Sequence, residues 1–154
     1  MSVEYKIGNI VEDDADLFVI PVNTVGVMGK GVALEFRNKY PEILPDYISV
    51  CNNNRLLPGK CIIFKFPSRN GYWAAFATKG HWRYPSKYEW IEKGLDDLRL
   101  IIESPKIFDN SSINSIAIPP LGCGNGGLDW KIVHEMIIDS LAKDRDIRIY
   151  GTKP

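Results

Sequence analysis

The stretch DLFVIPVNTVGVMGKGVALEF, residues 16–36, has the pattern of a strand, a loop and a helix in immediate succession. Residues 17–22 are a short apolar run, which predicts a buried strand. The loop NTVGVMGKG, residues 23–31, is rich in glycine and holds one lysine and no acidic residue. Residues 31–39 then have a helical pattern, so the stretch predicts one strand–loop–helix unit of an α/β fold.

A second stretch, NSIAIPPLGCGNGGLDW at residues 114–130, repeats this arrangement. It predicts a buried strand at residues 113–118, a glycine-rich loop at 122–127 and a helix at 130–142. Asp129 directly precedes that helix and is expected to be its N-cap. One such loop would most simply be a tight turn, but two at equivalent strand ends indicate one ligand held from both sides.

Strands and helices alternate along the rest of the chain. Ser86 and Glu89 of the SKYE sequence match a capping box, which predicts a helix from Ser86 to Ile102. An exposed connection is expected at residues 103–112. The other predicted elements are strands at residues 4–10, 60–66, 72–78 and 147–150, and a helix or turn at 45–51. The whole pattern predicts a three-layer α/β/α fold around a central mixed sheet of about six strands.

The composition narrows the class of protein. The 154 residues match the size of one domain, so we expect residues 1–154 to form a single domain, and a monomer. Lys and Arg number 19 and so do Asp and Glu, which leaves no global field to attract nucleic acid or a membrane. The three cysteines lack metal-ligand spacing and the first residues lack a signal peptide, so we expect the cytoplasm and no metal or other cofactor. No apolar run approaches the ~20 residues that cross a bilayer.

A glycine-rich loop that leads into a helix presents free backbone N–H groups and the positive end of the helix dipole, which favour phosphate. The first loop is not a P-loop, because Thr24 and Gly31 stand where a glycine and a magnesium-binding hydroxyl belong. The second loop matches G-x-G-x-x-G, but the 27 residues after Gly127 are too few for the rest of a dinucleotide-binding half. These departures disfavour an NAD-dependent dehydrogenase.

Three segments, GNI at residues 8–10, VIPVNTVGVMGKGVALEF at 19–36 and IPPLGCGNGGLDW at 118–130, resemble the macrodomain, an ADP-ribose-binding α/β/α module. The resemblance extends over essentially the whole chain. The segments MGKGVALEFRNKYP, ATKGHWR and GCGNGGLDW are similar to the macrodomains of antitoxins that are DNA ADP-ribosyl glycohydrolases. They are less similar to the terminal ADP-ribose protein glycohydrolases.

The resemblance implies ADP-ribose as the ligand and relates each part of it to residues of this chain. Asn9 and Ile10 would contact the adenine, with a turn-capping role as the alternative for Asn9. Asn23 would hold the distal ribose. The loops would hold the diphosphate, the first with Gly29, Lys30, Gly31 and Val32, the second with Pro120, Leu121, Gly122, Cys123, Gly124, Asn125, Gly126, Gly127 and Leu128.

Cleavage of a glycosidic bond at the distal ribose needs a paired acid and base or a nucleophile. Carboxylates are few near the loops, since Asp129 is expected as an N-cap and Glu35 is expected along a surface helix. Lys79 ends an apolar strand, where partial burial would lower the pKa of its amine and free it to attack C1″ and form a Schiff base. The resemblance to lysine-dependent macrodomains makes Lys79 the catalytic candidate, together with Asn23 and His81.

Two features bear on the substrate. Protein-directed relatives carry an aspartate in the second loop where this chain has Gly126, and this departure favours the DNA-directed class. Trp82 and Arg83 follow Lys79 and His81, and an aromatic ring beside a cation suits an unstacked base and its phosphate. The alternative for this pair is a core tryptophan and a solvated arginine.

The resemblance thus predicts an enzyme that removes ADP-ribose from thymidine in single-stranded DNA. Two alternatives stay open: a reader that binds ADP-ribose without cleaving it, and a hydrolase of ADP-ribosyl-glutamate protein or O-acetyl-ADP-ribose. The expected partners are the modified single-stranded DNA and, from the resemblance to antitoxins, a DNA ADP-ribosyltransferase toxin. The sequence holds no further domain for binding a toxin, so we expect either an excised domain or a stand-alone enzyme.

Overall fold

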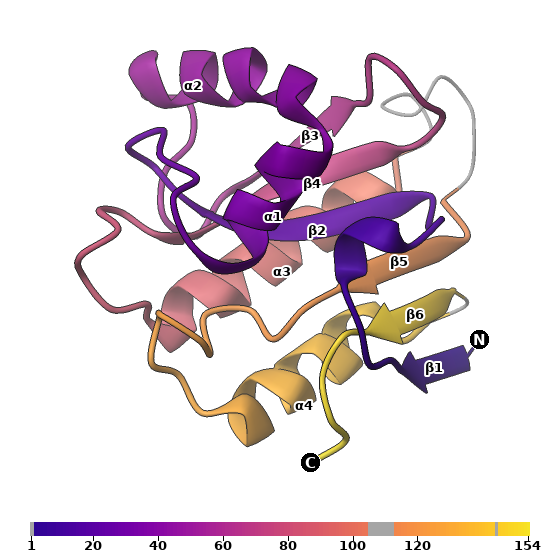
Figure 1. Ribbon diagram of the computed structural model, residues 1–154. Coiled ribbons are helices and arrows are strands. Elements are labelled where there is room, and N and C mark those ends of the chain that lie inside the picture. Colours follow the sequence, from indigo (N-terminus) through magenta and orange to yellow (C-terminus); the bar gives the residue numbers. More distant parts are fainter. Residues whose placement is uncertain (1, 105–112, 144) are drawn as a thin grey trace.

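The computed structural model describes residues 2–104, 113–143 and 145–154 and has three layers, with a central sheet between two pairs of helices (Figure 1). The sheet has six strands in the order β1-β6-β5-β2-β4-β3. Neighbouring strands are parallel except for β3 and β4, so the predicted mixed sheet is confirmed. The strands are β1 Ser2–Tyr5, β2 Leu17–Asn23, β3 Cys61–Lys65, β4 Tyr72–Lys79, β5 Ser115–Ile118 and β6 Asp146–Ile149.

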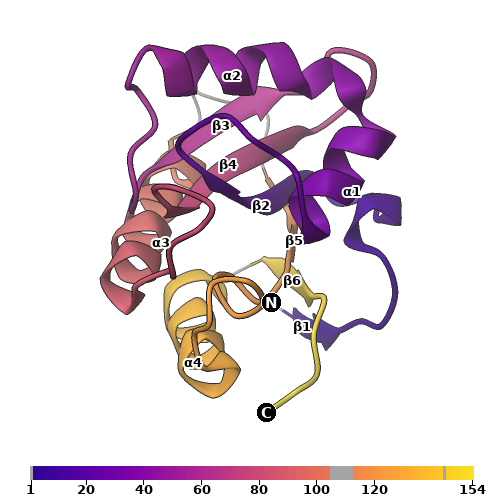
Figure 2. The same ribbon diagram turned by 60° about the vertical axis from the view of Figure 1, so that its left-hand side comes forward.

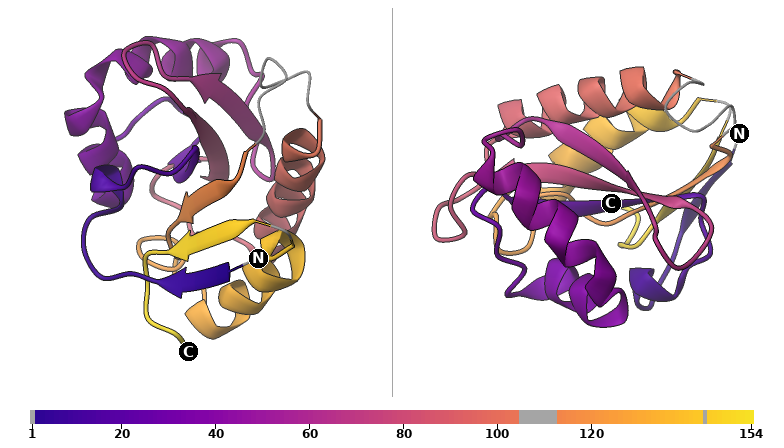
Figure 3. Two further views of the ribbon diagram at one scale, coloured as in Figure 1. Left: turned by 90° about the vertical axis from the view of Figure 1, so that its right-hand side faces the viewer. Right: turned by 90° about the horizontal axis from the view of Figure 1, so that it is seen from above.

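Two helices lie on each face of the sheet, as the view from above shows (Figure 3). One face carries α1 (Gly31–Lys39) and α2 (Leu44–Asn52), and the other carries α3 (Tyr88–Ile102) and α4 (Trp130–Leu141). Two short 3-10 helices, η1 (Ile10–Glu12) and η2 (Pro41–Ile43), complete the described elements. The three-layer prediction is therefore confirmed. Most of the connection predicted at residues 103–112 lies outside the described residues.

The run LFVIPVN forms the central strand β2, which explains why it is apolar almost throughout. Leu17 and Val19 pack on the side of α3 and α4, whereas Phe18 and Ile20 pack on the side of α1 and α2. All four side chains are fully buried. Burial of each contributes on the order of 2 kcal/mol, so the alternation of faces along β2 holds both helical layers onto the sheet.

The strand predicted at residues 4–10 is wrong in its extent. Strand β1 ends at Tyr5, and Gly8 has a φ of +126°, far from the φ of about −120° to −140° that is typical of strands. Asn9 then caps η1, because its side chain accepts a hydrogen bond from the Val11 N–H at 3.2 Å. A glycine followed by a capping asparagine therefore turns the chain out of the sheet.

The capping box predicted at Ser86 is also wrong. The α3 helix begins at Tyr88, and its N-cap Lys87 makes no side-chain capping bond. Ser86 instead packs beneath the loop after β5, where its backbone N–H donates to the Gly126 carbonyl at 3.0 Å. The Ser86 hydroxyl is buried without a hydrogen-bond partner. In contrast, Asp129 is the N-cap of α4 as predicted, accepting from the Lys131 N–H at 2.9 Å.

The topology brings three loops to the same end of the sheet, at the carboxyl ends of β2, β4 and β5 (Figure 2). We call them the first glycine loop (residues 24–30), the aromatic loop (residues 80–87) and the second glycine loop (residues 119–129). Ligands of open α/β sheets bind at this end of the strands. No helix within the described ranges is long and apolar enough to cross a membrane.

Candidate active site

A cavity of about 720 Å³ opens among the three loops. Its walls come from the end of β2, the first glycine loop, the start of α1, the end of β4 and both other loops. Its volume is within the range of small-molecule and cofactor sites. The lining residues are Pro21, Val22, Asn23, Val27, Gly29, Lys30, Gly31, Val32, Ala33, Thr78, Lys79, Trp82, Arg83, Pro119, Pro120, Gly122, Gly124, Asn125 and Gly126.

A second, smaller cavity of about 190 Å³ adjoins the first. Val32, Pro119 and Pro120 line both cavities, so the two form one elongated site. The remaining walls of the smaller cavity are Gly8, Asn9, Ile10, Glu35 and Tyr150. An elongated ligand with two bulky ends would fit this shape better than a compact one.

Asn23 organises the first glycine loop from the end of β2. Its Nδ2 donates to the Val27 carbonyl at 2.7 Å, and its Oδ1 accepts from the N–H groups of Val25 and Val27 at 3.2 and 3.3 Å. From α2, the buried Tyr47 hydroxyl lies 2.8 Å from the Asn23 carbonyl oxygen and 2.9 Å from Oδ1. Burial raises the pKa of Tyr47, which keeps the hydroxyl a neutral donor. One Nδ2 hydrogen of Asn23 is left for a ligand in the cavity.

The N-terminus of α1 faces the larger cavity through Gly31, Val32 and Ala33. Its N-cap is Lys30, which makes no side-chain capping bond, and Gly31 has a φ of +57°. The first-turn N–H groups of a helix have no partner within the helix, and the helix dipole favours an anion there. The start of α1 is therefore suited to a phosphate, as the sequence indicated.

The second glycine loop is a tight turn whose glycines have different roles. Gly122 and Gly127 have φ values of +72° and +79°, and the Leu128 N–H closes the turn on the Gly122 carbonyl at 2.9 Å. A Cβ at position 126 would lie 2.4 Å from both the Gly122 carbonyl oxygen and the Ser86 Oγ. A Cβ at position 124 would meet no atom within 4 Å. Gly126 is thus required by the packing of the loop, whereas Gly124 faces open space in the cavity.

Lys79, the last residue of β4, connects the second glycine loop to the aromatic loop. Its Nζ donates to the Asn125 carbonyl at 3.0 Å and to the Trp82 carbonyl at 3.3 Å. Burial lowers the pKa of Lys79 below the 10.5 of an unperturbed lysine, and the charge of Lys30 lowers it further. The direction of this pKa shift is the one expected from the sequence.

The lining of the larger cavity is cationic. Lys30, Lys79 and Arg83 contribute to it, and no Asp or Glu is among the residues that line it. The chain has zero net charge, so this positive character is local. Together with the free N–H groups of α1, it favours an anionic ligand such as a diphosphate.

The aromatic loop forms the outer rim of the cavity with Trp82 and Arg83. Trp82 is 43% exposed, so the alternative of a core tryptophan is wrong. The Arg83 guanidinium lies over the Trp82 ring, 5.1 Å from its centroid. His81 does not line either cavity, and its Nδ1 accepts a hydrogen bond from the Arg83 N–H at 3.1 Å.

Several loop residues expected at the ligand do not line the cavities. Leu121 is fully buried in the core, and Leu128 packs beneath Gly122. Burial raises the pKa of the Cys123 thiol to about 11, which makes it a poor nucleophile. The residues in the expected set that line neither cavity are His81, Leu121, Cys123, Gly127 and Leu128.

Other lining residues were not expected. Glu35, which was expected along a surface helix, is exposed but also borders the smaller cavity. Thr78 and Tyr150 lie at the carboxyl ends of β4 and β6. Their place in the lining could have been predicted, because ligands bind at the carboxyl ends of strands. Within the described part of the chain, no cluster of three or more His, Cys, Asp or Glu side chains could hold a metal ion.

The fold and the site together define an α/β/α domain with a cationic cavity between two glycine-rich loops, a shape and charge that suit an elongated anionic ligand. The family model of the Macro domain matches residues 19–137, and the chain belongs to this family.

Among known proteins, the chain is 38% identical over 149 residues to the DNA ADP-ribosyl glycohydrolase of Thermus aquaticus, covering 96% of this chain and 40% of that protein. The chain thus spans about 40% of the length of this curated relative. Among solved structures, it matches the macrodomain of Mycobacterium tuberculosis DarG at 37% identity with a TM-score of 0.88, covering 99% of both chains.

Thermosipho africanus provides two further similarities. A DNA ADP-ribosyl transferase–DNA ADP-ribosyl glycohydrolase fusion protein is 34% identical over 149 residues, covering 85% of this chain and 37% of the fusion. The solved structure of DarTG in complex with ADP-ribose matches with a TM-score of 0.83 at 30% identity, covering 98% of this chain and 43% of that chain.

Proposed function

We propose that this macrodomain is an ADP-ribosyl glycohydrolase that removes ADP-ribose from thymidine in single-stranded DNA, with Lys79 as its catalytic residue. The observation that carries the proposal is the amine of Lys79 in the cavity wall, with its pKa lowered by burial and by Lys30. The similarity to proteins named DNA ADP-ribosyl glycohydrolases supports the same reaction.

The two cavities suggest how ADP-ribose would lie. The adenine would occupy the smaller cavity beside Asn9 and Ile10. The diphosphate would lie between the start of α1 and the second glycine loop, where N–H groups and Lys30 favour it. The distal ribose would then lie in the larger cavity, beside Asn23 and Lys79.

The hydrogen bonds of Lys79 are compatible with a nucleophilic amine. A neutral amine has two N–H donors and one lone pair, and the carbonyls of Trp82 and Asn125 can accept both hydrogen bonds. The lone pair could then form a bond to C1″ while the bond from C1″ to thymine breaks and its electron pair leaves with thymine. Opening of the ribose gives a Schiff base, which water hydrolyses to release ADP-ribose and restore Lys79.

Two observations support DNA rather than protein as the carrier of ADP-ribose. Gly126 has no room for a side chain, so the second glycine loop cannot present a carboxylate at this position without rearranging. Trp82 and Arg83 place an exposed ring and a cation at the rim, as an unstacked base and a phosphate would need.

We further infer that residues 1–154 are one macrodomain and that a DNA ADP-ribosyltransferase is its biological partner. The fusion of the two activities in the Thermosipho africanus relative supports this partner. The three cysteines are free, as expected of a protein in the reducing cytoplasm, which is the compartment we propose.

A reader without catalytic activity is the second candidate. The two hydrogen bonds of Lys79 would also suit a lysine that only ties two loops together. Such a protein would bind ADP-ribose as well as the enzyme does, so binding alone does not separate the two candidates.

The deciding experiment incubates the purified chain with ADP-ribosylated single-stranded DNA and, separately, with glutamate-ADP-ribosylated protein. We expect release of ADP-ribose from the DNA. Lys79→Ala should slow release at least ~100-fold while ADP-ribose affinity stays within a few-fold, the pattern of a lost catalytic group. Lys79→Arg should not restore release, because a guanidinium stays protonated.

Each other outcome has a definite meaning. Release from the protein alone would replace the DNA substrate with ADP-ribosyl glutamate. Binding without any release would establish the reader. Near-normal release by Lys79→Arg would show that the residue is only an electrostatic contact and would exclude the Schiff base.

A further inference from the structure

The exposed aromatic side chains of the described residues are confined to one short segment. They are Trp82, Tyr84 and Tyr88, and every other described Phe, Tyr or Trp is less exposed than these three. Tyr84 is 67% exposed, more than any other described aromatic side chain. Exposed apolar groups that gather beside a cavity mark an interaction surface, whereas singly scattered ones do not.

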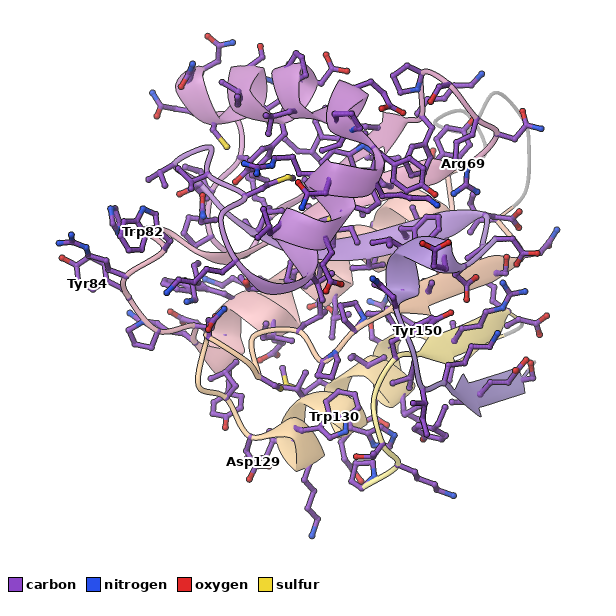
Figure 4. All side chains as sticks on the ribbon, in the orientation of Figure 1. Arg69, Trp82, Tyr84, Asp129, Trp130 and Tyr150 are labelled. Carbon is purple, nitrogen blue, oxygen red and sulfur yellow. The ribbon has the colours of Figure 1, made fainter. Side chains whose placement is uncertain are left out.

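The rings of the aromatic loop are held at a fixed spacing. The His81 ring lies 4.9 Å from the Trp82 ring and 5.7 Å from the Tyr84 ring, measured between centroids. The Tyr84 N–H donates to the His81 carbonyl at 3.1 Å, which closes the turn. Trp82 and Tyr84 project from this loop away from the body of the protein (Figure 4). His81 is therefore the shared neighbour of two outward rings.

The loop is also anchored to the reactive centre. The Trp82 carbonyl accepts a hydrogen bond from Lys79 Nζ at 3.3 Å, and the Gly80 carbonyl accepts one from the Thr24 N–H at 2.9 Å. Trp82 and Arg83 line the larger cavity, whereas Tyr84 does not. A polymer that enters the cavity over Trp82 and Arg83 would meet Tyr84 next, outside the cavity.

The charge of the loop matches a nucleic acid strand. The segment GHWRYPSK, residues 80–87, contains no acid, and the nearest acid in the sequence, Glu89, is already on α3. The Lys87 ammonium lies over the Trp90 ring of α3, 5.1 Å from its centroid, which leaves Arg83 as the loop's cation at the cavity. Bases of single strands stack on exposed aromatic rings while cations contact the phosphates. A chain of amino acids would gain no comparable stacking from successive units.

We propose that Tyr84 is a stacking platform for the base next to the modified nucleotide, so that the aromatic loop recognises a single-stranded oligonucleotide rather than an isolated ADP-ribosyl nucleoside. This inference rests on the proposed function and extends it outward from the cavity. Trp82 and Arg83 hold the modified nucleotide at the rim, His81 sets the distance between the rings, and Tyr84 holds the neighbouring base.

The test compares four substrates: ADP-ribosyl thymidine, a modified single-stranded oligonucleotide, and two versions of that oligonucleotide with an abasic site directly 5′ or directly 3′ of the modified thymidine. Wild type should prefer the intact oligonucleotide and lose that preference at one of the two abasic positions. Tyr84→Ala should lower kcat/KM for the intact oligonucleotide by about 5- to 150-fold, the range of one lost base stack. Leu100→Ala, an exposed truncation on α3, is the matched control and should change nothing.

The abasic oligonucleotide makes the test specific. If Tyr84 stacks on the neighbouring base, the Tyr84→Ala variant should be insensitive to the abasic site that impairs wild type, because both changes remove the same contact. Tyr84→Phe should retain the preference, since stacking needs the ring and not the hydroxyl.

Failure of this inference is distinct from failure of the proposed function. Equal cleavage of nucleoside and oligonucleotide by wild type, or additive losses from Tyr84→Ala and the abasic site, would overturn the platform and leave the glycohydrolase in place. A Tyr84 effect seen with an ADP-ribosylated peptide, and not with DNA, would assign the surface to a protein partner. Absence of ADP-ribose binding would remove the proposed function itself.

Discussion

At the scale of single residues, the Asn23 side chain both organises the first glycine loop and lines the larger cavity. Three of its four hydrogen-bonding contacts lie within its own loop, and the fourth comes from Tyr47 on α2. The contact with Tyr47 joins residues 24 positions apart, so no local sequence pattern predicts it. Under the proposed function, Tyr47 would be a positioning residue that acts on ADP-ribose only through Asn23.

Tyr47→Phe removes one hydroxyl and keeps the buried ring. We expect its ADP-ribose affinity to fall about 3- to 10-fold, the effect of one lost hydrogen bond, because Asn23 would be less well oriented toward the distal ribose. Affinity for ADP, which lacks that ribose, should change by less than about 2-fold. Titration calorimetry with both ligands measures the difference. Tyr40→Phe, which loses a hydroxyl contact to the Val11 carbonyl, is the control. If Tyr47→Phe lowers the affinity for ADP as much as that for ADP-ribose, Tyr47 is merely structural.

The effect of the Lys30 charge on Lys79 leads to a prediction about the pH dependence of kcat/KM. Attack requires the neutral amine, so kcat/KM should rise with pH through the pKa of Lys79 in the free enzyme, below 10.5. Lys30→Gln removes a like charge, which makes protonation of Lys79 easier and raises its pKa. The midpoint of the pH profile should therefore move to higher pH in this variant. An unchanged midpoint would show that Lys79 is not the group that titrates.

Residues differ in how far the sequence alone could place them. Lys79 could be predicted because the end of an apolar strand and a following glycine fix its place. Ser86 could not, since its local SKYE pattern is overridden by packing against Gly126, a contact between distant segments. The place of Glu35 beside the smaller cavity could not be predicted either. It depends on how residues 8–10, between β1 and β2, pack near the start of α1.

At the scale of elements, the second glycine loop contains one glycine that packing requires, Gly126, and one that faces the open cavity, Gly124. Gly126→Ala places a Cβ 2.4 Å from the Gly122 carbonyl oxygen, so the turn must shift. We expect a loss of about 1–3 kcal/mol in the free energy of unfolding, as for other overpacked sites, and weaker ADP-ribose binding. Urea denaturation and calorimetry measure the two effects.

Gly124 is the matched comparison in the same loop. A side chain there meets no protein atom within 4 Å, so Gly124→Glu should leave the free energy of unfolding within about 0.5 kcal/mol of wild type. The same variant should abolish ADP-ribose binding, because the carboxylate would occupy the cavity and repel the diphosphate. Unchanged affinity would mean that the loop is only a turn.

Asp13, directly after η1, connects this helix to the end of β6 through contacts with Arg148 and Tyr150. Its buried carboxylate lies 2.6 Å from Arg148 Nη1 and accepts a hydrogen bond from the Tyr150 hydroxyl. Burial by itself would raise the pKa of Asp13, but the hydrogen bonds from Tyr150 and Arg148 outweigh it and hold the pKa below 3.8. A pKa lowered by folding stabilises the protein above the unfolded value, and this stabilisation is lost as pH falls through the folded value.

Asp13→Asn should therefore cost about 1.5–3 kcal/mol of unfolding free energy at pH 7. The difference from wild type should shrink below pH 3.8, where the wild-type carboxyl also becomes neutral. Asp14→Asn is the control, because Asp14 contacts the same Arg148 but is 95% exposed and should matter little. A cost for Asp13→Asn that does not depend on pH would contradict the role of the charge.

The sequence predicted most elements well, and its failures have physical causes. The strand–loop–helix units around β2 and β5 were recognisable because their apolar runs, glycines and helix starts agree with one another. The extent of β1 was not, since Ile7 and Ile10 resemble strand residues, whereas β1 ends at Tyr5 and the positive φ of Gly8 turns the chain away from the sheet. The continuity of the two cavities depends on Val32, Pro119 and Pro120 meeting across layers, which no local pattern encodes.

At the scale of the whole molecule, zero net charge and a cationic cavity together decide how DNA would be attracted. A protein with a broad basic face loses affinity steeply with salt, because it releases many counterions from the nucleic acid. Here the balance of 19 basic and 19 acidic residues excludes an overall attraction. The attraction must come from the few cations that line the larger cavity, namely Lys30, Lys79 and Arg83.

This arrangement limits the salt dependence of binding to a modified single strand. With at most three phosphate contacts, the slope of log affinity against log salt should be no steeper than about −2, at roughly 0.7 per contact for single strands. Arg83→Gln should make the slope shallower by about 0.7, and Lys143→Gln, two residues after the end of α4, should leave it unchanged. The measurement uses the Lys79→Ala variant, because its cleavage is expected to be at least ~100-fold slower. With at most two contacts left, its slope should be no steeper than about −1.4. A slope near −5 would require a basic surface beyond the cavity and would contradict recognition by a local site.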